Sequence, residues 1–103
     1  MTGYDNGTLR GAVIAINASM AIEFGPEKIR FNVINPALGV TGLVTNFTGG
    51  GDTPEMRERF SAMIPLRRLT TPRDIANAAV FLSSDEADFI TGAVLQVDGG
   101  RAI

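Results

Sequence analysis

Few side chains in this chain could carry out acid–base or nucleophilic chemistry. The 103 residues include no cysteine and no histidine, and only one tyrosine, Tyr4, and one lysine, Lys28. Without Cys or His, most structural zinc sites and most nucleophile–base pairs are excluded. Tyr4 stands in a polar, turn-rich opening segment, residues 1–8, which we expect to be frayed. We therefore interpret Tyr4 as a terminal aromatic residue rather than a catalytic acid.

The remaining polar candidates are concentrated between residues 37 and 52. This segment is rich in Gly and Thr, contains the run Gly49-Gly50-Gly51, and is expected to be a mobile loop. The hydroxyl and amide groups that could contact a small ligand belong to Thr41, Thr45, Asn46 and Thr48. The glycine run follows a loop rather than a strand, so it does not predict a phosphate-binding turn.

The elements that would position these residues begin with a helix over residues 9–24. Thr8 is the expected N-cap, and Gly25-Pro26 should end the helix. A mostly apolar segment, residues 29–34, reads as a strand that ends at Asn35-Pro36. An uninterrupted apolar strand suits a parallel sheet that is covered on both faces.

The second half of the chain predicts two helices and a strand. Thr53-Pro54-Glu55 should start a short helix that reaches about residue 63. Thr71 and Asp74 have the spacing of a capping box for a helix that ends at Ser83-Ser84-Asp85. Residues 93–97 form the last strand, closed by a turn at Asp98-Gly99-Gly100. The order helix–strand–helix–helix–strand predicts an α/β fold with two parallel strands in one partial domain, residues 1–103.

Charge and hydropathy narrow the range of partners. The net charge is −2, and the closest basic cluster is the pair Arg67-Arg68, which we interpret as solvated rather than as an anion site. We therefore expect no nucleic-acid partner. No apolar run approaches the ~20 residues needed to cross a bilayer, and no secretory signal opens the chain. These features predict a cytoplasmic protein without a membrane segment.

The helix over residues 9–24 is apolar nearly all round, which indicates burial on more than one side. Two short parallel strands also leave unpaired edges. We therefore expect a homo-oligomer that forms through helix 9–24 and the edge of strand 29–34.

Several segments match one family in order and spacing. They are Arg30-Phe31-Asn32-Val33-Ile34-Asn35-Pro36, Ile64-Pro65-Leu66-Arg67-Arg68, Thr71-Pro72-Arg73-Asp74-Ile75-Ala76, Ile90-Thr91-Gly92 and Val97-Asp98-Gly99-Gly100. Together they resemble the carboxyl-terminal part of the short-chain dehydrogenase/reductase family, over about residues 10–103. Ala37 and Arg67 stand where the family usually has glycine.

This resemblance implies a fragment of a doubly wound, Rossmann-like fold and NAD(P)-dependent carbonyl reduction or alcohol oxidation. Thr41 falls where the family uses a threonine hydroxyl against the nicotinamide carboxamide, and Pro36 and Ala37 belong to the same cofactor-contacting motif. Complete members are more than twice as long as this chain. The glycine-rich pyrophosphate turn and the catalytic serine would belong to the other part.

The family's catalytic tyrosine and lysine lie four residues apart on one helix. Aligned on Gly11-Ala12-Val13, these positions are Asn6 and Arg10, and an amide cannot act as the proton donor. Aligned instead on Tyr4, the lysine position is Thr8. Neither alignment gives a working pair, so no catalytic residue is predicted.

Three functions remain open. The first is a truncated relative that self-associates, binds no cofactor alone and has no oxidoreductase activity. The second is a subunit of a split NAD(P)-dependent oxidoreductase that a separate amino-terminal chain completes. The third is a binding module that uses the loop after the first strand.

Overall fold

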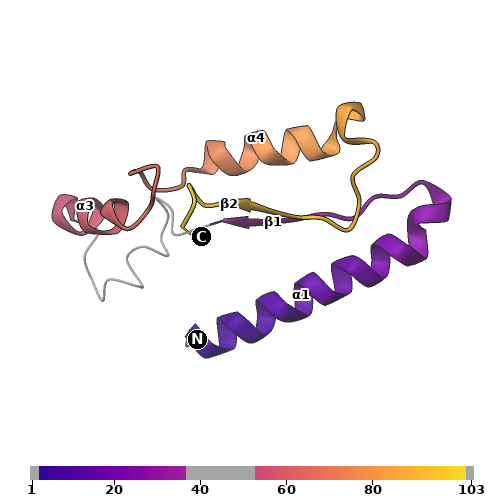
Figure 1. Cartoon of the computed structure of the whole chain (residues 1–103), viewed down its shortest axis with the longest axis horizontal. Helices are drawn as coiled ribbons and strands as arrows, with labels where there is room; N and C mark the ends of the chain where they lie inside the picture. Colours follow the sequence, from indigo (N-terminus) through magenta and orange to yellow (C-terminus); the bar gives the residue numbers. More distant parts are fainter. Residues whose placement is uncertain (1–2, 37–52, 102–103) are drawn as a thin grey trace. The chain divides into compact units, whose positions relative to one another are not determined.

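The computed structural model describes residues 3–36 and 53–101, with side chains for residues 10–36 and 53–101. In chain order the elements are α1 (Gly3–Phe24), the 3₁₀ turn η1 (Gly25–Glu27), β1 (Val33–Pro36), α3 (Pro54–Ala62), α4 (Pro72–Ser83), the 3₁₀ turn η2 (Asp85–Ala87) and β2 (Val94–Val97). Figure 1 shows them in sequence colours. The predicted order of helices and strands is confirmed.

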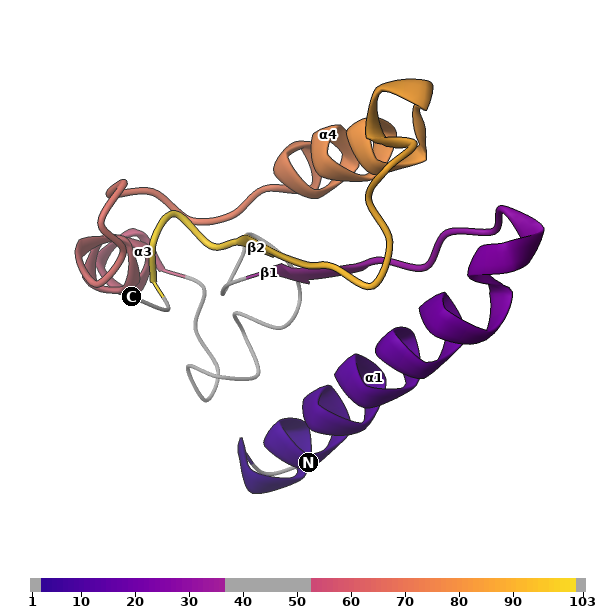
Figure 2. The ribbon, with the colours of Figure 1, turned by 45° about the vertical axis from the view of Figure 1, so that its right-hand side comes forward.

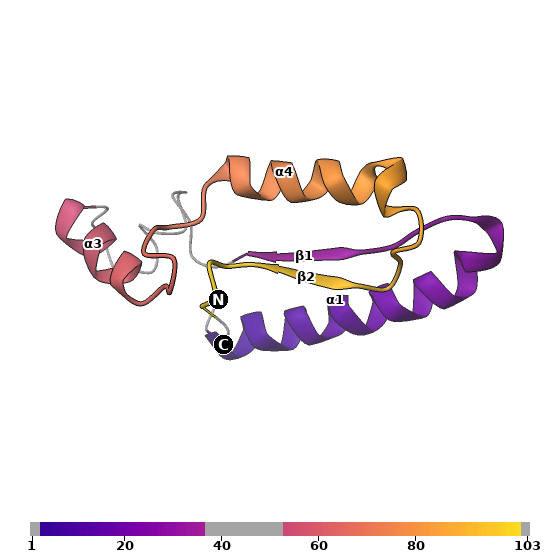
Figure 3. The same cartoon turned by 45° about the horizontal axis from the view of Figure 1, so that its top comes forward.

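β1 and β2 form a two-stranded parallel sheet, as the sequence predicts. The two strands lie side by side in Figure 1, Figure 2 and Figure 3. The chain divides into two compact units, here called unit 1 (Met1–Val33 and Phe81–Leu95) and unit 2 (Ile34–Val80 and Gln96–Ile103). The division falls within both strands and within α4.

In unit 1, α1 begins at Gly3 rather than at residue 9. Thr8 is therefore inside the helix, and the prediction that it caps the helix is wrong. Asn6-Gly7 reads as a turn in the sequence, but one glycine within a helix costs only about 1 kcal/mol. A helix that continues for several turns beyond Gly7 tolerates that cost. The carboxyl end is where the sequence places it, at Phe24.

The first strand is also displaced from its predicted range. β1 covers Val33–Pro36 and not residues 29–34. The preceding residues run beside residues 90–93, but side chains replace part of the backbone ladder. The Phe31 N–H donates to the Thr91 hydroxyl at 3.0 Å. The Asn32 amide donates to the Ile90 carbonyl at 3.0 Å and accepts from the Ala93 N–H at 3.0 Å.

Only one half of α1 is covered within unit 1. Asn17 and Ala21 are buried, and the Asn17 amide donates to the Ala93 carbonyl at 3.3 Å. The side chains of residues 10–16 are all exposed, including Val13 and Ile16. The segment of α1 from residue 10 to residue 16 therefore has no cover within the described part of the chain.

In unit 2, the helix starts follow local capping rules. The Thr53 hydroxyl accepts from the Met56 N–H at 3.2 Å, so the predicted start of α3 is confirmed. At α4, the Asp74 N–H donates to the Thr71 hydroxyl at 3.3 Å, and the Thr71 N–H donates to the Asp74 carboxylate at 2.8 Å. This reciprocal pair is the predicted capping box.

The turn before α4 packs against the turn that closes β2. Ile64, 2 % exposed, lies against Gly99, where a Cβ would come within 2.6 Å of the Ile64 side chain. Gly99 also has a positive φ of 62°, so both space and backbone conformation favour glycine. The Leu66 N–H donates to the Gly99 carbonyl at 3.1 Å and joins the two turns.

Lys28 provides a test of backbone strain in unit 1. It ends η1 in the left-handed region, with φ 64°, while its N–H donates to the Gly25 carbonyl. A left-handed backbone costs a non-glycine residue about 1 kcal/mol. We predict that Lys28→Gly raises the free energy of unfolding by about 1 kcal/mol in urea denaturation. Lys28→Ala is the control, because it removes the side chain but keeps the strain, and should change stability by less than about 0.5 kcal/mol. Equal effects of the two variants would contradict the strain argument.

Candidate functional site

The carboxyl ends of β1 and β2 are where an open parallel sheet binds ligands. Pro36 is the last residue of β1 and is exposed. Next to it, the Asn35 amide donates to the Gln96 side-chain oxygen at 2.8 Å. Ala37, Thr41, Thr45, Asn46 and Thr48 lie outside the described residues. The structure therefore shows one of the three predicted cofactor-contacting residues at the expected edge.

The two positions that the resemblance aligns with the family's catalytic dyad lie on α1. Asn6 and Arg10 are four residues apart within this helix, so their backbone positions share one helix face. Arg10 is exposed, and the side chains of Tyr4 and Asn6 lie outside the described residues. The spacing of a dyad is present in the backbone, while the residue types that would transfer a proton are absent from these two positions.

The chain's only phenol and only ammonium group cannot replace that dyad. Tyr4 lies in the first turn of α1, and Lys28 follows the end of the same 22-residue helix. A straight helix of that length is about 33 Å long. Because acid–base partners must approach to about 3 Å, Tyr4 and Lys28 cannot act on one substrate atom.

A hollow of about 530 Å³ opens in unit 2 at the carboxyl end of β2. Its walls include Pro65, Leu66, Arg68, Gln96, Gly99 and Gly100. A Cβ at Gly100 would come within 3.1 Å of Pro65, so glycine keeps the two walls in close contact there. The sequence analysis interpreted the Gly99-Gly100 turn as structural and did not predict this hollow. Two adjacent glycines after a strand were the available signal.

An ion pair between Arg68 and Asp74 lies in the wall of this hollow. Both guanidinium NH₂ groups of Arg68 donate to the Asp74 carboxylate, at 2.6 and 2.8 Å. The Arg68 hydrogen bonds hold the pKa of Asp74 well below its usual range, and the Thr71 N–H lowers this pKa further. Asp74 in turn raises the pKa of Arg68 through the same hydrogen bonds. Asp74 therefore stays ionised and both caps α4 and anchors Arg68.

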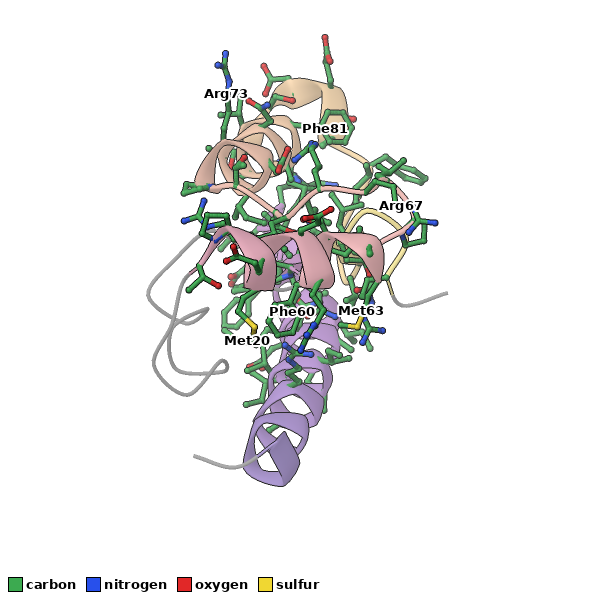
Figure 4. The ribbon with its side chains drawn as sticks, turned by 90° about the vertical axis from the view of Figure 1, so that its left-hand side faces the viewer. Met20, Phe60, Met63, Arg67, Arg73 and Phe81 are labelled. Carbon is green, nitrogen blue, oxygen red and sulfur yellow. The ribbon has the colours of Figure 1, made fainter. Side chains whose placement is uncertain are left out.

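Arg67 and Arg68 are both exposed, as predicted, but each also has a hydrogen-bond partner within unit 2. Arg68 binds Asp74, and Arg67 donates to the Ala62 carbonyl at the end of α3. Arg67 also has a φ of 60°, a left-handed conformation that suits glycine, the residue that the resemblance leads one to expect at this position. Figure 4 shows Arg67 beyond the end of α3, with Phe60 and Met63 on one side of that helix. The sequence did not reveal these partners because a turn, rather than a periodic element, brings them together.

The described residues do not supply a complete dinucleotide site. No Gly-x-x-x-Gly-x-Gly segment follows a strand anywhere in the 103 residues. The sequence therefore lacks the glycine pattern of a pyrophosphate turn, and the cofactor contact at Pro36 stays a prediction. Within residues 3–36 and 53–101 no cluster of acidic side chains could hold a metal ion. None of the helices in the same ranges is long and apolar enough to cross a membrane.

Comparison with known proteins defines the family. Residues 5–102 match the family model described as enoyl-(acyl carrier protein) reductase. The chain belongs to the short-chain dehydrogenase/reductase family and matches the carboxyl-terminal part of its relatives. It is 47 % identical over 94 residues to 4-formylbenzenesulfonate dehydrogenase of Comamonas testosteroni, which covers 91 % of this chain and 37 % of that protein. The chain thus spans little more than a third of this relative.

Two solved structures support the fold. An NADPH-dependent reductase involved in bacilysin biosynthesis superposes with a TM-score of 0.85 at 28 % identity, over 95 % of this chain and 39 % of the other. The 3-ketoacyl-(acyl-carrier-protein) reductase of Brucella melitensis, solved with NADH, gives a TM-score of 0.79 at 45 % identity, over 90 % and 35 % of the two chains. The predicted Rossmann-like fragment is confirmed.

The Asp74–Arg68 pair generates a pH-dependent prediction. Because the pKa of Asp74 is lower in the folded chain than in the unfolded chain, its stabilisation is complete above about pH 4 and is lost as the pH falls through the folded value. We predict that Asp74→Asn melts at a lower temperature than the wild type at pH 7. The difference should be constant from pH 7 to about pH 5 and then shrink below about pH 4. Thermal melts followed by circular dichroism measure it.

The matched control for this prediction is Glu58→Gln, an exposed position on α3. It makes the same chemical change away from α4 and should not lower the melting temperature at pH 7. An Asp74→Asn difference that persists unchanged at pH 2 would show that the charge of Asp74 is not what stabilises α4.

Proposed function

We propose that this chain supplies the nicotinamide-facing edge of an NAD(P)-dependent oxidoreductase fold and, acting alone, has no oxidoreductase activity. The observation that carries the proposal is the separation of Tyr4 and Lys28 along α1. Asn6 and Arg10 occupy the family's dyad positions, and neither side chain can donate the proton that a carbonyl oxygen needs.

The family supports the reaction class of the complete fold. One relative is a reductase described as NADPH-dependent, another was solved with NADH, and a third is named 4-formylbenzenesulfonate dehydrogenase. We infer that a completed assembly would carry out carbonyl reduction or alcohol oxidation with NAD(P). Pro36, Ala37 and Thr41 would then contact the nicotinamide. The cytoplasmic location expected from the sequence remains a prediction.

The second candidate is a split enzyme, in which a separate amino-terminal chain of the same family completes the fold. The exposed middle segment of α1, residues 10–16, favours it. The chain also spans only 37 % of the length of its sulfonate dehydrogenase relative, so most of that fold lies in segments this chain does not contain. In this case the partner would contribute the pyrophosphate turn, the serine and the dyad.

Self-association is the other way to cover exposed apolar surface. Val13, Ile14, Ile16 and Ile22 are exposed large side chains on α1. Burying such side chains contributes roughly 1.5–3 kcal/mol each. We infer that copies of this chain associate through α1, with the free edge of β1 as a second contact.

Cofactor binding tests the proposed function directly. We predict that titrating the chain into NADH or NADPH gives no saturable change in nicotinamide fluorescence, because no pyrophosphate turn is present. The chain should also reduce no carbonyl substrate. Binding that appears only when an amino-terminal family chain is added would favour the split enzyme. Saturable binding by the chain alone would refute the proposal.

The α1 interface has its own test. We predict that the double variant Val13→Ser and Ile16→Ser lowers the mass measured by light scattering toward that of the 10.9 kDa chain. Val80→Ser is the control, since Val80 is an exposed apolar residue of α4 and not of α1. A wild-type chain that is monomeric at every concentration would refute self-association.

A further inference from the structure

The hollow of unit 2 has no role in the proposed function. Its volume of about 530 Å³ lies within the range of sites that enclose small ligands, roughly 300–1,000 Å³. All of its lining residues come from two segments of unit 2, residues 65–74 and 96–100. The hollow is therefore formed within one compact unit and needs no residue of unit 1 or of a partner chain.

One part of the lining is apolar. It is formed by Pro65, Leu66 and Val97. Leu66 is 70 % exposed, so most of its side chain is available to a ligand. The Leu66 N–H donates to the Gly99 carbonyl at 3.1 Å, which holds this wall in place against the turn after β2. A ring or short hydrocarbon chain that packs on these side chains would remove apolar surface from water on both sides.

The other part of the lining carries an excess of negative charge. The lining contains one guanidinium, that of Arg68, and two carboxylates, those of Asp74 and Asp98, so its net charge is −1. Arg68 and Asp74 bind and neutralise each other. Asp98 is only 9 % exposed, and its carboxylate accepts from the Gly100 N–H at 3.0 Å. The negative charge of Asp98 is therefore held in a fixed place, where water screens it less than an exposed charge.

The exposed arginines next to the hollow do not reverse this charge. Neither Arg67 nor Arg101 is a lining residue. The Arg67 guanidinium donates to the Ala62 carbonyl at the end of α3. Arg101 is exposed, so water and salt screen its charge more than that of the buried Asp98. The hollow therefore favours a cation over an anion such as a carboxylate or a sulfonate.

We propose that this hollow binds a small organic cation, a primary amine that is attached to a ring or a short hydrocarbon chain. The hydrocarbon part packs on Pro65, Leu66 and Val97, and the ammonium group donates to the Asp98 carboxylate. A carboxylate has about four acceptor sites, so Asp98 can accept from an ammonium group in addition to the Gly100 N–H. The site goes beyond the proposed function, because it requires neither a dinucleotide nor a catalytic dyad.

The experiment compares three probes that differ only in the charged or polar group attached to one benzyl group. They are benzylamine, benzyl alcohol and phenylacetate, each tested against the full chain at pH 7 and low salt. Equilibrium dialysis measures the affinity, and the backbone amide NMR signals of Gly99 and Gly100 report where the probe binds. Benzylamine should bind at least about tenfold more tightly than phenylacetate, the effect of one hydrogen bond to a charged group, and benzyl alcohol should fall between them.

A variant of the lining tests the role of charge. Leu66→Lys adds a cation to the lining and changes its net charge from −1 to 0. It should weaken benzylamine binding by at least about fivefold and change benzyl alcohol binding by less than about twofold. Val80→Lys is the matched control, since Val80 is also 70 % exposed and belongs to unit 2 but does not line the hollow. Both side chains are exposed, so neither change removes a core contact.

Each outcome supports or overturns the amine site. Benzylamine binding that shifts the Gly99 and Gly100 signals and is weakened only by Leu66→Lys supports it. Equal affinity for the three probes overturns the selection by charge, and unchanged Gly99 and Gly100 signals overturn the location. An equal loss in Val80→Lys would show that the overall charge of the chain, and not the hollow, attracts the amine. The nicotinamide titration tests the proposed function separately, because no dinucleotide is present in this experiment.

Discussion

The structure of unit 1 depends on one side-chain amide, that of Asn32. It donates to the Ile90 carbonyl and accepts from the Ala93 N–H. These two bonds take the place of backbone hydrogen bonds between strands and join segments that are 58 to 61 residues apart in the sequence. The Asn17 amide adds a third bond, to the Ala93 carbonyl, and ties α1 to the same segment. Few apolar side chains of unit 1 are buried, so these polar bonds determine which segments pair. Asparagine is suited to this role because its amide donates and accepts in one plane, as a peptide group does.

Unit 2 is stabilised by other interactions: two turns pack closely against each other, and an ion pair forms at the start of α4. Gly99 has no Cβ, so Ile64 can fill the space beside it and become one of the most buried residues of the chain. Asp74 accepts from Thr71 and from Arg68 at once, which fixes the first turn of α4 to the segment that precedes it. These contacts also form the walls of the hollow, so the same residues that stabilise the turn leave an apolar recess open to solvent.

How much of this could be predicted from the sequence depends on how local each interaction is. Thr53 and Thr71 cap their helices through residues three positions away, and both starts were predicted correctly. The start of β1 was predicted wrongly, because apolar composition does not reveal that the Asn32 side chain replaces the ladder before Val33. The pairing of Arg68 with Asp74 was not predicted. It depends on a turn in which Arg67 has a left-handed backbone, and the sequence has no glycine there to indicate such a turn. The predicted cofactor contacts at Ala37 and Thr41 remain predictions, and only Pro36 has a described position.

Family membership and activity rest on different residues in this chain. The residues that carry the resemblance, such as Asn32, Asp74 and Gly99, make the hydrogen bonds and close contacts that preserve the fold. Catalysis would instead require a phenol and an ammonium group one helical turn apart. α1 provides that spacing at residues 6 and 10, but the side chains there are an amide and a guanidinium. The 47 % identity to a dehydrogenase over 94 residues therefore supports the family, while the aligned dyad positions, Asn6 and Arg10, remain a prediction.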